Sequence, residues 1–225
     1  MIITFYGHSS FLVDLGGKKI LFDPFISPND QAKHIDVSSI QADYILVSHG
    51  HGDHVADVQV IAQNSDATLV SNFEIVSWFA AQGLTKGHPM NHGGSWLFDF
   101  GTVKYVQAVH SSVLPDGTYG GNPGGFVVQG EKSFYYAGDT ALTLDMQLIP
   151  KYAKLDLAIL PIGSNFTMDY EDAIIASDFV DCSLVLGVHY DTFPYIKIDR
   201  EAAKKAFSDA GKELILLEIG ESFEI

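Results

Sequence analysis

The sequence has one cysteine, one arginine and no long apolar segment, and each scarcity excludes a class of protein. Cys182 has no second cysteine with which to form a disulfide inside the chain. No apolar run approaches the ~20 residues that a transmembrane helix requires, so we expect no membrane partner. Segment 1–13 lacks a basic stretch and a cleavage site, and we expect it to form a strand rather than an export signal. These absences predict a cytoplasmic protein.

Positive charge is also scarce, because 13 Lys and Arg residues face 28 Asp and Glu residues, for a net charge of −15. Nucleic-acid binding draws much of its affinity from Lys and Arg side chains that neutralise phosphates, so the composition disfavours a nucleic-acid partner. Arg200 is the only arginine, which also argues against an arginine clamp for carboxylate or phosphate ligands. We therefore expect a small-molecule substrate.

The length fits one domain, which we predict over residues 1–225. Each half begins with short β-rich segments around turns and continues with alternating strands and helices. The expected strands are 2–6, 10–15, 19–22, 44–48, 67–71, 95–100, 103–108, 125–129, 133–137, 157–160, 184–188 and 214–218, and the expected helices are 54–63, 73–82, 170–180 and 200–210. Asp169 and Asp199 lie where N-caps belong. One architecture that satisfies this order is an α/β (α+β) fold with two packed sheets and helices outside.

Segment 49–54, His-Gly-His-Gly-Asp-His, follows a predicted buried strand and is the strongest chemical signal in the chain. Imidazole and carboxylate are common ligands of zinc, manganese and iron. His49 and His51 point the same way on an extended segment, while Asp53 and His54 follow where the chain turns into a helix. The intervening glycines remove side chains that would crowd a metal. A solvated polar loop is the alternative, but the spacing favours a metal site.

Three further candidate ligands, His110, Asp139 and His189, each end a predicted strand. In α/β architectures ligands collect at the carboxyl ends of strands. Taken singly, each residue is explained as well by a structural role, such as a helix N-cap for Asp139. Taken together with segment 49–54, they predict two adjacent metal sites that share a carboxylate.

This ordered set of residues resembles the metallo-β-lactamase superfamily, and more closely its branch of small metal-dependent hydrolases related to ascorbate phosphate lactonase. The similarity runs over the whole chain and includes segments 7–9, 21–24, 110–112, 119–123, 138–140, 165–168 and 187–194. The resemblance implies a four-layer αββα sandwich, which agrees with the predicted order of elements.

The resemblance also implies a role for each ligand. His49, His51 and His110 would bind a first metal; Asp53, His54 and His189 would bind a second; and Asp139 would bridge both. We expect two divalent ions per chain, zinc by preference, with manganese, iron or nickel as alternatives. A hydroxide held between the metals would attack the substrate, which makes Asp53 and Asp139 the catalytic candidates.

Six other residues are candidates for contacting substrate or for holding the ligands in place: His8, Asp23, His92, Asn165, Tyr190 and Thr192. The resemblance places the turn around His8 beside the pocket, although a structural turn histidine is the alternative. His92 stands where relatives usually carry a small or apolar residue, and a surface loop histidine is its alternative explanation. Segment 120–125 lacks the lysine and following helix of a phosphate loop, so we predict a mobile flap or a tight turn.

These inferences predict a metal-dependent hydrolase that acts on a small ester, lactone or phosphodiester. A metal-binding sensor with little catalysis is the alternative, and metal-dependent turnover would separate the two. The sequence carries no interface signature, so both a monomer and a homo-oligomer stay open.

Overall fold

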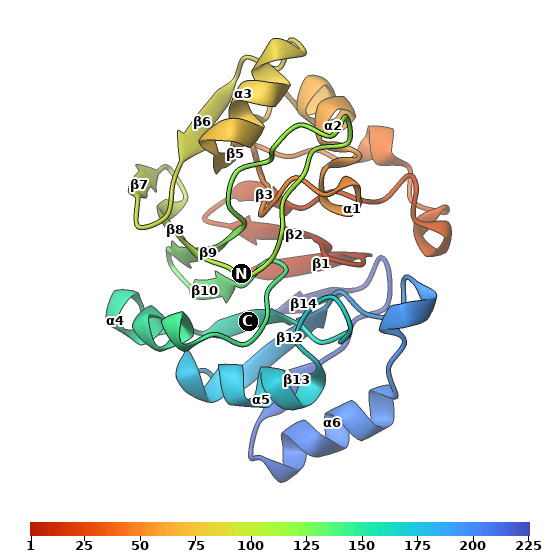
Figure 1. The fold of residues 1–225 in the computed structure, drawn as a ribbon, viewed down its shortest axis with the longest axis vertical. Helices are drawn as coiled ribbons and strands as arrows, with labels where there is room; N and C mark the ends of the chain where they lie inside the picture. Colours follow the sequence, from red (N-terminus) through yellow and green to blue (C-terminus); the bar gives the residue numbers. More distant parts are fainter.

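The computed structural model describes residues 1–225 and contains two seven-stranded sheets (Figure 1). The first sheet has, in spatial order, β14 (Ser222–Glu224), β1 (Ile2–Gly7), β2 (Ser10–Leu15), β3 (Lys18–Phe22), β4 (Tyr44–Leu46), β5 (Thr68–Asn72) and β6 (Gly87–Met90). The second has β13 (Glu213–Ile215), β12 (Leu184–Val188), β11 (Leu157–Pro161), β10 (Ser133–Tyr136), β9 (Gly124–Gln129), β8 (Gly101–Gln107) and β7 (Ser95–Phe98). Strands β3–β6 and β10–β13 pair in parallel, and the other neighbours pair antiparallel.

Helices cover the outer face of each sheet. The α-helices are α1 (Gly52–Val55), α2 (Val58–Ser65), α3 (Phe73–Ala81), α4 (Ile149–Tyr152), α5 (Tyr170–Phe179) and α6 (Arg200–Asp209), and the 3₁₀ turns are η1 (Asp30–Ala32), η2 (Val37–Ser39), η3 (Leu144–Leu148) and η4 (Pro194–Ile196). Helices α2 and α3 share an apolar cluster with the first sheet, and α5 and α6 share one with the second. The prediction of two packed sheets with helices outside is confirmed. None of the helices combines the length and apolar character needed to cross a bilayer.

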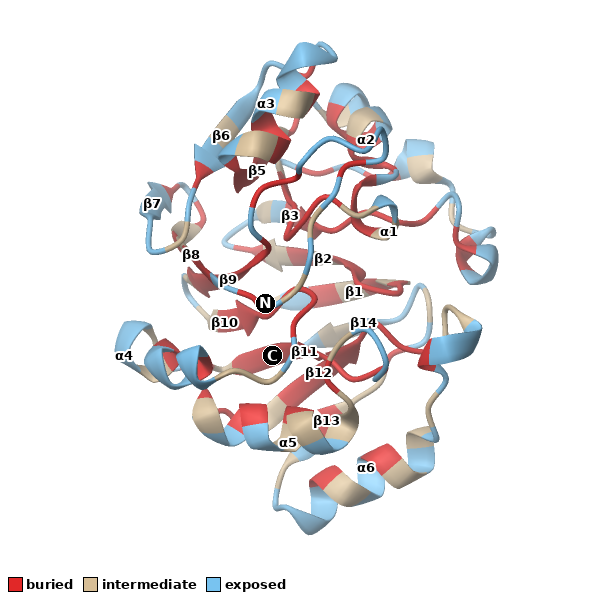
Figure 2. Cartoon of the chain, in the orientation of Figure 1, coloured by how far each residue is buried: buried red, intermediate tan, exposed pale blue.

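The main core lies between the two sheets and is rich in aromatic side chains. Phe11 and Phe22 of the first sheet stack with their ring centroids 4.7 Å apart. Phe22 then meets Phe126 and Tyr136 of the second sheet edge to face, at 6.1 and 5.5 Å. In Figure 2, strands of the two sheets are coloured largely red, for buried, where the sheets face each other. Each such ring removes a large apolar area from water, so this interface holds the two sheets in a fixed relation.

Local sequence signals account for several element boundaries. Gly16 and Gly17 form the hairpin turn between β2 and β3 with φ of +60° and +75°, a conformation that glycine adopts without steric cost. The side chain of Asp169 accepts from the backbone N–H of Asp172 at the start of α5. Asp199 accepts from Glu201 N and Ala202 N at the start of α6. Both predicted N-caps are therefore confirmed.

The continuous helix predicted over 54–63 is wrong, because the chain forms α1 and α2 with a break between them. At the break, the carboxylate of Asp57 accepts hydrogen bonds from the backbone N–H groups of Ile26 and Ser27 and from the Ser27 hydroxyl. The Asp57 N–H in turn donates to Pro24 O. These contacts with a distant loop hold Asp57 out of helical geometry and leave α1 as a single turn.

Candidate metal centre

All seven predicted metal ligands lie at the carboxyl ends of strands that meet on one side of the sandwich. His49 follows β4, and His51 is the residue before α1, which carries Asp53 and His54. His110, Asp139 and His189 follow β8, β10 and β12. His189 adopts a left-handed backbone with φ of +57°, and its N–H donates to His8 O at 2.8 Å. Strand ends of both sheets therefore contribute to one cluster.

The ligand atoms form two groups, each compact enough for one ion. His49, His51 and His110 make up one group, and Asp53, His54 and His189, together with His8, make up the other. Within each group all candidate ligand atoms lie within 4.8 Å of one another. The first group is the set that the resemblance implied for one metal, and the second adds His8 to the set implied for the other. Asp23, His49 and His54 also lie within this distance of one another.

Asp139 lies between the two groups. Its Oδ2 is 3.9 Å from His49 Nε2, 3.2 Å from His54 Nε2, 3.8 Å from His110 Nε2 and 2.9 Å from His189 Nε2. The carboxylate is 2% exposed. Four imidazole nitrogens from three segments of the chain thus converge on one buried carboxylate oxygen, the arrangement that a bridging ligand requires.

The protonation of this cluster follows from burial and from the neighbouring charges. Burial disfavours the charged form of His54, but Asp139, Asp53 and Asp23 outweigh it and raise the pKa of His54 well above 6.5. Burial, with His54 nearby, lowers the pKa of His49 well below 6.5. Burial opposes ionisation of Asp139, yet His189 and His54 hold its pKa well below 3.8. One imidazolium therefore offsets part of the buried negative charge when no metal is bound.

Asp23 orients two of the ligands from behind. Its Oδ2 accepts from His54 Nδ1 at 2.8 Å, from Tyr136 OH at 2.5 Å and from Ser48 Oγ at 2.5 Å. Because the Ser48 hydroxyl donates to Asp23, it accepts from His49 Nδ1, 2.9 Å away. Both imidazoles therefore have Nδ1 occupied, which leaves Nε2 as the nitrogen that faces Asp139, as metal-binding histidines require. His49 Nε2 also lies 2.9 Å from His51 Nδ1.

His8 performs a related task for Asp53. Its Nε2 lies 3.1 Å from Asp53 Oδ2 and its Nδ1 lies 3.0 Å from Thr192 Oγ1. Burial lowers the pKa of His8 to about 4, so the ring is neutral and its single N–H donates to the carboxylate, which only accepts. Burial opposes the charge on Asp53, but His54 and the His8 hydrogen bond lower its pKa.

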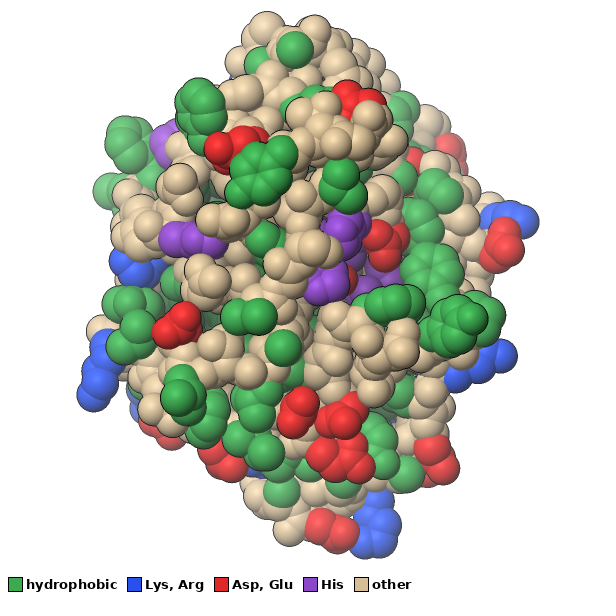
Figure 3. Space-filling model, viewed as in Figure 1, with side chains coloured by type: hydrophobic (Ala, Val, Ile, Leu, Met, Phe, Trp, Pro, Cys, Tyr) green, Lys and Arg blue, Asp and Glu red, His purple; other side chains and the backbone are tan.

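A cavity of about 830 Å³ opens over the cluster. His51, Asp53, His110, Asp139 and His189 form one part of its lining. In Figure 3, histidine side chains reach the surface in a hollow near the middle of the view, with hydrophobic side chains beside them. The remaining lining includes four aromatic residues that sequence reasoning missed, Phe25, Phe166, Phe193 and Tyr195, because no spacing rule identifies them.

Two other predicted site residues, Tyr190 and Asn165, do not line the metal-site cavity. Tyr190 is buried, and the Arg200 guanidinium lies over its ring, 5.3 Å from the ring centroid. Tyr190 lines a different cavity. Asn165 is exposed and precedes Phe166, which does line the metal-site cavity. Segment 120–125 is tied down by hydrogen bonds, including Asn72 Nδ2 to Gly120 O at 2.7 Å and Gly124 N to Ser48 O at 3.0 Å. Residues 120–123 form no helix, strand or turn, and Gly124 and Gly125 begin β9.

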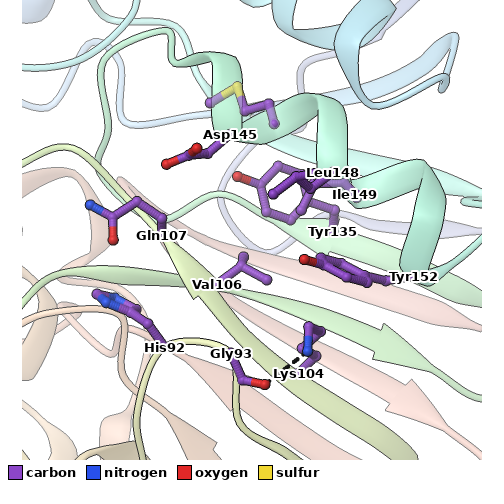
Figure 4. Close-up of a pocket in the computed structure, with 11 residues that line it drawn as sticks. His92, Gly93, Lys104, Val106, Gln107, Tyr135, Asp145, Leu148, Ile149 and Tyr152 are labelled. Atoms are coloured by element: carbon purple, nitrogen blue, oxygen red, sulfur yellow. Dashed lines mark hydrogen bonds between the residues drawn. The ribbon is translucent and has the colours of Figure 1, made fainter.

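His92 lines a separate cavity of about 280 Å³, shown in Figure 4, between β8 and the η3–α4 segment. Its Nε2 lies 2.8 Å from Pro123 O, and its ring stacks on Tyr105 at 5.0 Å. Tyr135 also lines this cavity, and its buried hydroxyl has no hydrogen-bond partner. The structure does not bring His92 together with the seven ligands.

The donor set fits divalent metal ions. His54 Nε2, Asp139 Oδ1 and His189 Nδ1 are buried atoms without a hydrogen-bond partner, although buried polar groups are normally paired. His54 and His189 belong to the second group of the cluster, and Asp139 lies between the two groups. Imidazole nitrogens together with carboxylate oxygens are a donor set typical of zinc and related ions. Asp23 and His8 hydrogen-bond to His54 and Asp53 and fix their orientation.

The two-sheet fold and this histidine–carboxylate centre define a protein of the metallo-β-lactamase superfamily, and the model of the beta-lactamase superfamily domain matches residues 2–189. The chain belongs to the UPF0173 metal-dependent hydrolase family. It is 64% identical over 226 residues to a member from Flavobacterium johnsoniae and 57% identical over 227 residues to one from Christiangramia forsetii, with 100% of both chains covered in each case. The prediction of a metal-dependent hydrolase from this superfamily is confirmed.

Solved structures show the same fold. Igni18, a metallo hydrolase from Ignicoccus hospitalis, superimposes with a TM-score of 0.89 at 32% identity, over 100% of this chain and 98% of that one. An isothiocyanate hydrolase from Delia radicum gut bacteria superimposes with a TM-score of 0.80 at 17% identity, over 100% and 99% of the two chains. The second similarity concerns the fold alone.

Proposed function

We propose that this hydrolase cleaves small esters, lactones or simple phosphodiesters with two divalent metal ions bound per chain. The observation that carries the proposal is the convergence of four imidazole nitrogens within 4.0 Å of one Asp139 oxygen at the base of an open cavity. His49, His51 and His110 would hold one ion, Asp53, His54 and His189 the other, and Asp139 both. Zinc is the preferred metal for such a histidine-rich set.

The bound ions supply Lewis acidity and lower the pKa of a coordinated water toward about 7. The chain's own residues supply the positioning. Asp53 has a lowered pKa and a side chain that is 27% exposed to the cavity, so at neutral pH it is an ionised acceptor for a proton of the attacking water. The His8 N–H occupies Asp53 Oδ2 on the protein side and fixes the orientation of the carboxylate.

A panel assay tests this function. The metal-stripped protein is reloaded with zinc or manganese and given a set of lactones, carboxylic esters and a chromogenic phosphodiester. We expect turnover that depends on the added metal and that is lost in His49→Ala. A sensor would bind two ions with high affinity and turn over none of the panel, and that result would replace the hydrolase proposal.

A further inference from the structure

Two pairs of aromatic side chains form one wall of the metal-site cavity. Phe25 and Phe193 lie with their ring centroids 6.1 Å apart, and both contact the His8 ring edge to face, at 5.5 and 5.3 Å. Phe166 and Tyr195 form an edge-to-face pair at 6.4 Å nearer the solvent. The first pair therefore adjoins the metal ligands, and the second extends the wall outward.

The outer pair, Phe166 and Tyr195, exposes much of its apolar surface to solvent. Phe166 is 51% exposed and Tyr195 is 75% exposed. Exposed aromatic surface grouped beside a cavity marks a binding site more often than isolated apolar residues do.

Both side chains are held in place by hydrogen-bonded loops. Ser164 N donates to Met168 O at 2.9 Å and Met168 N donates to Thr140 O at 3.0 Å, which closes the loop that carries Phe166. Asp191 N donates to Ile196 O at 2.7 Å, and Ile198 N donates to Asp191 Oδ1 at 3.0 Å, which closes the loop that carries Tyr195. These hydrogen bonds therefore fix the backbone of the two loops that present the exposed rings.

No lysine or arginine side chain that could pair with a polyanionic substrate lines the metal-site cavity. Its twelve lining residues include neither lysine nor arginine. In Figure 3 the basic side chains lie at the edge of the view, away from the histidine hollow. The only binding chemistry outside the ligand cluster is aromatic and apolar, with the hydroxyl groups of Ser111 and Tyr195 and the backbone as additions.

We infer that the substrate is an uncharged ester or lactone that carries an aromatic group, packed against the exposed rings of Phe166 and Tyr195 while its carbonyl lies at the metal ligands. This inference rests on the proposed function. In the reaction, the oxygen of water bonds to the carbonyl carbon and the carbonyl carbon–oxygen single bond breaks. The leaving oxygen takes one proton of that water, and the resulting carboxylic acid releases its proton to solvent.

Two matched lactones test the inference: γ-phenyl-γ-butyrolactone and γ-butyrolactone, followed by proton release on ring opening. We expect the wild-type kcat/KM to be about 10-fold higher for the phenyl lactone, because stacking on the aromatic wall strengthens binding. Phe166→Ala and Tyr195→Ala should each lower the phenyl-lactone value by about 3- to 10-fold, mainly through KM, and leave the unsubstituted lactone within about 2-fold.

Phe73→Ala is the matched control, since Phe73 is 60% exposed on α3 and does not line the cavity. It should change neither lactone, and all variants should keep the wild-type metal content. Equal rates on the two lactones in the wild type, or an equal loss on both in Phe166→Ala, would overturn the inference.

A binding measurement separates this inference from the proposed function. Phenylacetohydroxamic acid and acetohydroxamic acid carry the same metal-chelating head, and calorimetry gives their Kd values on metal-loaded protein without any turnover. We expect about 10-fold tighter binding of the phenyl compound, reduced in Phe166→Ala. If no lactone, ester or phosphodiester of the panel is hydrolysed, the proposed function fails, and the two Kd values still decide whether the aromatic wall binds an aromatic group.

Discussion

The position of one carboxylate, Asp139, controls how the two metal groups relate to each other. Its Oδ2 faces the Nε2 atoms of His49 and His110 on one side and those of His54 and His189 on the other. Removal of this side chain takes a ligand from both groups at once, whereas removal of a single imidazole affects one. This difference is measurable as metal stoichiometry.

We expect Asp139→Ala to lose metal from both positions and His189→Ala to lose mainly one ion per chain. Elemental analysis after dialysis against a weak chelator measures the content. Asp145→Ala, an exposed aspartate on η3, is the control and should keep the wild-type content. Two ions per chain at unchanged affinity in Asp139→Ala would show that this carboxylate does not bridge.

The raised pKa of His54 predicts that metal binding releases a proton. Near pH 6 the pH is below the raised pKa of His54, so this imidazole is charged before metal arrives. Burial lowers the pKa values of His49, His51 and His110, so at neutral pH these three bind metal without losing a proton. His54 must become neutral to ligate, and about one proton per chain should leave from it.

Titration calorimetry with zinc in two buffers of different ionisation enthalpy measures this proton. Work near pH 6 keeps most coordinated water protonated, so ligand deprotonation dominates the signal. The binding enthalpy should differ between the buffers by about one ionisation enthalpy per chain. Identical enthalpies would contradict a charged His54 in the metal-free protein.

At the scale of elements, β10 carries adjacent tyrosines that face opposite layers with opposite hydrogen-bonding states. The Tyr136 hydroxyl donates to buried Asp23 at 2.5 Å, behind the metal ligands. The buried Tyr135 hydroxyl, on the other face, has no partner. Two substitutions that each remove one hydroxyl therefore test two different environments on the same strand.

Tyr136→Phe should lower the free energy of unfolding by about 1–3 kcal/mol, because a buried carboxylate loses a donor. Tyr135→Phe removes no hydrogen bond and should stay within about 0.5 kcal/mol of wild type. Urea unfolding of the metal-free proteins gives both values. Equal destabilisation by the two variants would mean that the Tyr136–Asp23 hydrogen bond contributes little.

The elements also show which parts of the site the sequence could predict. Ligands that directly follow strands were predictable, because strand direction and segment spacing are local properties. The aromatic wall was not, since the loops that present Phe166 and Tyr195 turn through non-glycine residues with positive φ, including Ser164 at +63° and Asp191 at +61°. Such conformations are imposed by surrounding contacts and are only weakly marked by residue type.

The edge strand β6 and the break between α1 and α2 were also not predictable from the sequence. β6 contains Gly87 and Pro89, which disfavour strands, yet it pairs with β5 at the edge of the sheet, where a proline is tolerated. The break between α1 and α2 depends on Asp57 contacting residues 26 and 27, far away in the chain. Long-range hydrogen bonds decided both features, and pattern analysis does not detect them.

The charge of the whole molecule disfavours polyanionic substrates. The net charge is −15, and the one arginine is already paired, with Arg200 Nε 2.8 Å from Asp191 and its NH1 2.7 Å from Glu218. A polyanion would meet repulsion over most of the surface, and added salt would weaken that repulsion. Metal ions bound at the proposed site would attract negative charge locally.

We therefore expect negligible cleavage of a structured RNA at low salt by metal-loaded protein that hydrolyses a lactone in the same buffer. A gel assay for RNA and proton release for the lactone measure both activities. His49→Ala serves to show that any activity belongs to the metal site. Efficient RNA cleavage that disappears in His49→Ala would overturn the charge argument.

The pairing of β14 with β1 has a consequence for how the protein is made. Residues 222–224 hydrogen-bond along the outer edge of the strand at residues 2–4, so the two ends of the chain lie side by side. Residues 2–4 emerge from the ribosome long before residues 222–224, and the outer edge of β1 stays open until β14 arrives. During this interval the nascent chain presents an unpaired edge that another chain could join. The first sheet is therefore begun early in synthesis, and it is completed only when β14 pairs with β1.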